Sequence, residues 1–102
     1  MKIGIIITLL SQENKSHQKL ITKFLNHTKD FHLCFVNNGA NQNNLNYLSQ
    51  FNTKQISVVN IKNEKSYEQA LRIGFRYITS NFNFNILCFT SNRDLPKLSS
   101  LL

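Results

Sequence analysis

Four short runs of apolar residues alternate along this chain with stretches whose apolar residues repeat at helical spacing. The runs lie at residues 2–9, 32–37, 55–60 and 85–89. Near-continuous apolar runs of this length are typical of strands that are buried on both faces of a parallel sheet. The pattern therefore predicts four buried strands.

The three connections between these runs carry the helical patterns. Apolar residues at positions 20, 21, 24 and 25 predict a first helix, and those at 45, 48 and 51 predict a shorter one. The third pattern covers residues 67–78, and Ser66 with Gln69 three residues later predicts a capping box at its start. A final helix is expected after Pro96, since proline is tolerated in a first helical turn.

Strands and helices in strict alternation predict an α/β fold, a three-layer sandwich in which helices cover both faces of a small, mainly parallel sheet. At 102 residues, the chain is expected to form one domain, residues 1–102. The predicted core consists of Leu20, Phe24, Leu48, Leu71 and Phe75 on the helices and Ile5, Ile7, Leu33, Phe35, Val58, Leu87 and Phe89 on the strands.

The net charge of +7, from 12 basic and 5 acidic residues, favours an anionic partner. Nucleic acid is not expected, because the basic residues are scattered singly from Lys2 to Lys97. Cys34 and Cys88 lie inside apolar runs without metal-site spacing, which predicts two reduced core residues in a cytoplasmic protein. No signal peptide and no membrane span are expected, since no apolar run is long enough.

Polar residues follow the second apolar run directly, at Asn37, Asn38 and Gly39. Open α/β sheets bind ligands at the carboxyl ends of their strands, so this edge is the expected binding site. The chain has no glycine-rich phosphate loop and no G-x-S-x-G elbow. The three histidines, at 17, 27 and 32, lack the spacing of a helical metal pair and are expected to be solvated.

Four segments in the same order resemble the nucleotide-binding half of the family 2 glycosyltransferases, which have the GT-A fold. The first strand ends at Thr8, and residues 36–42 read V-N-N-G-A-N-Q where the family has V-D-D-G-S-x-D. Residues 70–74 read A-L-R-I-G where the family has A-L-N-x-G. Residues 89–96 read F-T-S-N-R-D-L-P, with Thr90 and Asn92 at the places of the metal-binding D-x-D aspartates.

The resemblance implies a Rossmann-like sheet in the order 3-2-1-4 and a site for a nucleotide diphosphate-sugar. The candidate nucleotide-binding residues are Thr8, Asn37, Asn38, Gly39, Arg72, Thr90, Asn92, Arg93 and Asp94. Asn side chains can still bond a base, since an amide both donates and accepts. Threonine and asparagine replace an anionic metal pair poorly, so neither a metal site nor another cofactor is expected.

The sequence therefore predicts a degenerate nucleotide-sugar-binding module or a fragment of a divergent glycosyltransferase, without transfer activity in these 102 residues alone. The family's acceptor-binding half would be a downstream partner. The alternative is a non-catalytic structural protein that keeps only the scaffold and forms a homodimer through residues 96–102. A receiver-like or flavodoxin-like domain is disfavoured, because the first strand ends without an acidic pair or a phosphate loop.

Overall fold

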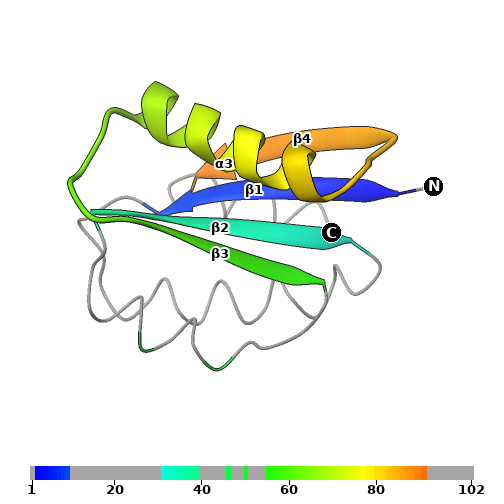
Figure 1. Ribbon diagram of the computed structural model, residues 1–102, viewed down its shortest axis with the longest axis horizontal. Helices are drawn as coiled ribbons and strands as arrows, with labels where there is room; N and C mark the ends of the chain where they lie inside the picture. Colours follow the sequence, from blue (N-terminus) through cyan, green and yellow to red (C-terminus); the bar gives the residue numbers. More distant parts are fainter. Residues whose placement is uncertain (1, 10–30, 40–45, 47–49, 51–54, 92–102) are drawn as a thin grey trace.

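The fold is a four-stranded parallel sheet with a helix across one face (Figure 1). The computed structural model describes residues 2–9, 31–39, 46, 50 and 55–91. The strands are β1 (Ile3–Leu9), β2 (His32–Asn38), β3 (Ile56–Ile61) and β4 (Ile86–Ser91), and the helix is α3 (Tyr67–Asn81). Every pairing is parallel and the strand order is β3-β2-β1-β4. The predicted α/β class and strand order are confirmed.

The two central strands are buried along almost their whole length, as their apolar runs predict. Side chains alternate between the two faces of the sheet. Ile5, Ile7 and Phe35 belong to the core on the face away from α3. Ile6 and Val36 belong to the core beneath α3. The branched and aromatic residues that give the strands their β propensity thus also fill both cores.

Helix α3 begins where its sequence predicts. The Ser66 hydroxyl accepts a hydrogen bond from the Gln69 backbone N–H at 3.2 Å, and the Gln69 side chain accepts from the Ser66 N–H at 3.4 Å. This capping box satisfies two of the amide groups that a helix start leaves unpaired. Ala70, Gly74 and Ile78 form the buried stripe. A Cβ added to Gly74 would lie 2.5 Å from Val36 Cγ2, so glycine lets the helix approach the sheet closely.

Three residues predicted to be in the core are exposed instead. Phe89 is 62% exposed, Phe75 is 50% exposed, and Cys88 is exposed as a free thiol. The physical reason is the position of β4, which pairs with β1 on one side and with no other described strand. Phe89 and Cys88 lie on this outer strand, and Phe75 lies on α3 beside Phe89 along one groove. Among the described residues, no further strand or helix covers Phe89, Cys88 and Phe75 on this side of the sheet.

The other predicted core residues divide into three groups. Ile5, Ile7, Leu33 and Phe35 are buried, as predicted. Val58, Leu71 and Leu87 are partly buried and pack against the two cores. Leu20, Phe24, Leu48 and the helix expected after residue 96 lie outside the described residues. Within the part of the chain that the structure describes, no helix is long and apolar enough to cross a membrane.

Candidate ligand site at the carboxyl edge of the sheet

The strand order places a topological switch point between β1 and β4. The chain moves from β1 outward to β2 and β3, and then returns to the other side of β1 to form β4. In open α/β sheets, ligands bind outside the carboxyl ends of the strands at such a point. Helix α3 also begins at this edge, because it follows the carboxyl end of β3 (Figure 1).

Two buried hydroxyl groups lie at the switch point. Thr8 and Ser91 are partners in the β1–β4 register, and both are buried. Among the buried side chains that the structure describes, the Thr8 hydroxyl has no hydrogen-bond partner. Nearly all buried polar side chains in folded proteins are hydrogen bonded, so an orphaned hydroxyl here calls for a specific explanation. Ser91 was not predicted as a site residue, although the predicted strand order places β4 beside β1.

Asn37 is the next polar residue along the edge. Its side chain is buried, and its Nδ2 donates a hydrogen bond to Asn60 Oδ1 at 3.2 Å. Asn37 and Asn60 are register partners on neighbouring strands β2 and β3. The side chain of Asn37, which stands where the glycosyltransferases have an aspartate, therefore links the ends of β2 and β3. Asn60 is a second residue that the sequence did not single out.

The side chain of Asn38 forms hydrogen bonds with the backbone of the loop before α3. Its Nδ2 donates to the Lys65 carbonyl at 2.8 Å, and its Oδ1 accepts from the Lys65 N–H at 2.9 Å. Gly39 follows with φ at 90°, a conformation that disfavours side chains, and its N–H donates to the Ile61 carbonyl at 2.9 Å. These two residues fix the loop that delivers the N-terminus of α3 to the edge.

A groove of about 480 Å³ runs between α3 and β4 on the same face of the sheet as Thr8. Its floor includes Ile6, which precedes Thr8 by one side-chain repeat, and its walls include Phe75 and Phe89. Arg72 and Arg76 line the helix side. The Arg72 guanidinium makes an exposed ion pair with Glu68 at 2.8 Å, as the spacing of the two residues predicts.

The remaining predicted site residues do not gather at this point. Thr90 pairs with Ile7, so its side chain belongs to the opposite face of the sheet from Thr8. Asn92, Arg93 and Asp94 lie outside the described residues. No group of three or more potential metal ligands occurs among the described residues.

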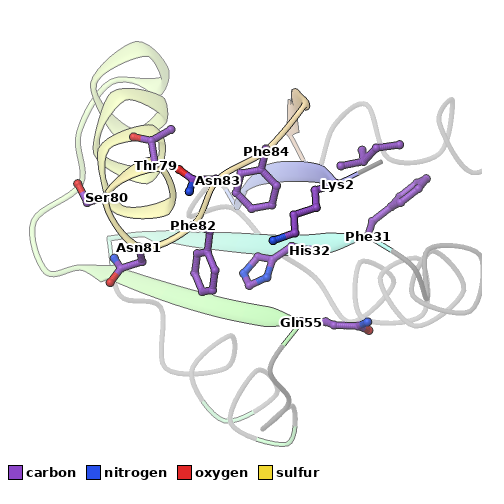
Figure 2. A pocket seen from close by; sticks show the side chains of 11 residues that line it. Lys2, Phe31, His32, Gln55, Thr79, Ser80, Asn81, Phe82, Asn83 and Phe84 are labelled. Carbon is purple, nitrogen blue, oxygen red and sulfur yellow. The ribbon is translucent and has the colours of Figure 1, made fainter.

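A second cavity lies at the opposite, amino-terminal edge of the sheet, where no site was predicted (Figure 2). It includes His32, a residue that its sequence position predicts to be solvated. The His32 ring is instead partly buried against Phe82 and Phe84, and its Nε2 lies 2.8 Å from Ser57 Oγ. Burial lowers the pKa of His32 from its ordinary value of 6.5. The signal in the sequence is the F-N-F segment at residues 82–84, which lies directly before β4.

Comparisons of the chain with protein-family models, with curated proteins and with solved structures find no match. The fold assignment therefore rests on the strand order and pairing described above. The glycosyltransferase resemblance stays a hypothesis about function, because a fold alone does not determine function.

Proposed function

We propose that this chain is a glycosyltransferase-like module that binds the nucleotide diphosphate part of a nucleotide sugar without a divalent metal. The proposed site lies at the carboxyl ends of β1 and β4 and extends into the groove between α3 and β4. The module is degenerate, since the carboxylates that would hold a metal in the family are absent at Thr90 and Asn92.

The orphaned hydroxyl of Thr8 is the observation that carries this proposal. It lies at the switch point of the sheet, and because it is fully buried, a ligand that supplies the missing hydrogen-bond partner must displace the residues that cover it. A phosphate oxygen is a suitable acceptor for a hydroxyl donor. The start of α3 at the same edge favours an anion, because a helix N-terminus carries partial positive charge.

The groove between α3 and β4 supplies the rest of a nucleotide site. Phe75 and Phe89 expose aromatic surface on which a base can stack. Arg72 and Arg76 line the same groove, and a guanidinium group can bond two phosphate oxygens at once. Arginine thus takes over part of the charge neutralisation that a metal ion gives the family.

A titration with uridine diphosphate, followed by amide chemical shifts in NMR spectra, tests this function. We expect weak binding, with a Kd of about 0.1–1 mM. The shifts should concentrate on Thr8, Ser91 and the start of α3, and uridine without phosphates should bind more weakly. Unchanged spectra at several times the upper Kd, or shifts confined to the amino-terminal edge, would contradict the proposal.

Among the described residues, β4 has no strand on its outer side, which favours a second candidate function, self-association. The strand exposes Ile86 at 43% and Phe89 at 62%, and its sequence, I-L-C-F-T-S, contains neither proline nor a charged residue. Proteins normally protect an edge strand with such residues, because its unpaired backbone groups can pair with another chain. A second copy of β4 in antiparallel pairing would form a twofold-symmetric dimer. The contact expected at residues 96–102 lies outside the described residues.

Sedimentation equilibrium of the wild-type chain and of Phe89→Asp distinguishes the two candidates. Self-association predicts a dimer that the substitution converts to a monomer, since it places a charge in the apolar interface. Tyr77→Asp is the matched control, because Tyr77 is similarly exposed on α3 but does not line the groove. A wild-type monomer at all concentrations would eliminate this candidate and leave the binding module.

A further inference from the structure

The cavity at the amino-terminal edge of the sheet has the size and lining of a small-molecule site. Its volume is about 550 Å³, within the ordinary range for ligand pockets. It is lined by the first residues of β1 and β2, by the last turn of α3 and by residues 82–84 (Figure 2). It shares no lining residue with the groove between α3 and β4, but the two are neighbours, since Arg76 and Leu87 line the groove and Thr79 and Phe84 line the cavity.

One wall of this cavity is an aromatic cluster. The ring centroids of His32 and Phe82 are 4.2 Å apart, those of His32 and Phe84 are 5.7 Å apart, and those of Phe82 and Phe84 are 6.1 Å apart. All three residues line the cavity, and Phe82 is still 37% exposed. A planar ring of a ligand can extend this cluster, because offset and tilted aromatic contacts are favourable beyond the area they bury.

The aromatic wall is held in place by its own contacts. Ser57, which is buried on β3, lies within hydrogen-bond distance of the His32 ring and fixes its orientation. The Phe82 N–H donates to the Ile78 carbonyl at 3.0 Å, which ends α3 and sets the direction of residues 82–84. The wall is therefore preorganised, which lowers the cost of binding.

The electrostatics of the cavity define the charge of its ligand. Lys2 is the one charged residue among its described lining residues, and its side chain extends toward His32 and Phe82 in Figure 2. Burial favours the neutral form of His32, so this ring adds no second positive charge at neutral pH. The nearby helix end is the C-terminus of α3, whose carbonyl groups carry partial negative charge. Lys2 can balance one negative charge, and the negative helix end opposes any further negative charge. A single carboxylate therefore suits this setting, whereas a multiply charged phosphate does not.

We propose that the amino-edge cavity binds a small planar aromatic monocarboxylate, whose ring stacks on the His32–Phe82–Phe84 cluster and whose carboxylate pairs with the Lys2 ammonium. The amide groups of Gln55 and Asn83, which also line the cavity, are available as further hydrogen-bond donors. This site is distinct from the nucleotide site in position, in charge and in ligand class.

The test uses 2-naphthoate as the probe, with its neutral alcohol analogue, 2-naphthylmethanol, and its cationic amine analogue, 2-naphthylmethylamine, as comparisons. Amide shifts in NMR spectra of the whole chain report both affinity and position. We expect 2-naphthoate to bind at least fivefold more tightly than either analogue and to shift residues 2–3, 32 and 79–84. Binding of the amine at equal or higher affinity, no binding up to about 10 mM, or shifts at Thr8 and Ser91 instead would overturn the proposal.

Two substitutions separate the charge contribution from the stacking contribution. Lys2→Met should weaken 2-naphthoate at least fivefold and leave the alcohol unchanged, whereas Phe82→Ala should weaken both probes. Lys62→Met, which removes an exposed lysine at the other edge of the sheet, is the matched charge control. Equal loss of affinity in Lys2→Met and Lys62→Met would mean that only net charge attracts the probe, which contradicts the site.

Discussion

At the scale of single residues, the polar side chains of the carboxyl edge differ in what they already bind. Asn38 uses both ends of its amide on Lys65, and Asn37 bonds Asn60, whereas the Thr8 hydroxyl has no partner. The sequence predicted that polar residues would gather at this edge. It did not predict which of these side chains would form hydrogen bonds within the fold, because that depends on the path of the loop before α3.

The two cysteines should differ sharply in reactivity. Cys34 is fully buried, and burial raises the pKa of its thiol to about 12, so almost no thiolate forms at neutral pH. Cys88 is exposed on β4. We expect Ellman's reagent to titrate one thiol in the native protein and two in denaturant. Cys88→Ser should abolish the native reaction, and a rapid native reaction in that variant would show that Cys34 is accessible.

His32 should make the stability of the fold depend on pH in one direction. Because its pKa is lowered in the folded state, the unfolded chain binds more protons as the pH falls below 6.5. The contribution of His32 to stability is thus complete above 6.5 and is lost as the pH falls through its lower folded pKa. Chemical denaturation at about pH 7 and about pH 5 should show a smaller loss of stability on acidification in His32→Gln than in the wild type. An equal loss in both proteins would contradict this assignment.

At the scale of elements, local sequence signals predicted the existence and order of the strands and of α3. Apolar runs marked β1 and β2, and Ser66 with Gln69 marked the start of α3. The errors at Phe75, Phe89 and Cys88 share one cause. An apolar run does not say whether its strand lies in the middle or at the edge of a sheet, and β4 is flanked by β1 alone among the described strands. Burial thus follows from strand order, which is a property of the whole sheet.

The contact between α3 and the sheet depends on the missing side chain at position 74. Gly74→Ala should lower the free energy of unfolding by about 1–3 kcal/mol, because its Cβ would meet Val36, even though alanine favours helices. Ser80→Ala, at an exposed position of the same helix, should change it by less than about 0.5 kcal/mol. Urea denaturation measures both. A stabilised Gly74→Ala would mean that helix and sheet are not in close contact there.

At the scale of the whole molecule, one sheet presents two edges of different character. Helix α3 begins at the carboxyl edge and ends beside the amino-edge cavity, so its positive and negative ends lie at opposite edges of the sheet. Arg72 and Arg76 line the groove between α3 and β4, whereas Lys2 is the one charged residue among the described lining of the amino-edge cavity. The resemblance to glycosyltransferases predicts a site at the carboxyl edge only. Local sequence patterns could not predict the amino-edge cavity, because its lining comes from segments far apart in the sequence.

The most direct test of the proposed function is the affinity of Thr8→Val for uridine diphosphate, together with the stability of that variant. Valine keeps the shape of threonine and removes the orphaned hydroxyl. We predict that the free protein becomes more stable by about 1–3 kcal/mol, because an unsatisfied buried group is lost. Affinity for the nucleotide should fall about tenfold, equivalent to about 1.4 kcal/mol, while Thr79→Val at the far end of α3 leaves it unchanged. Unaltered affinity in Thr8→Val would contradict a ligand site at the switch point of this sheet.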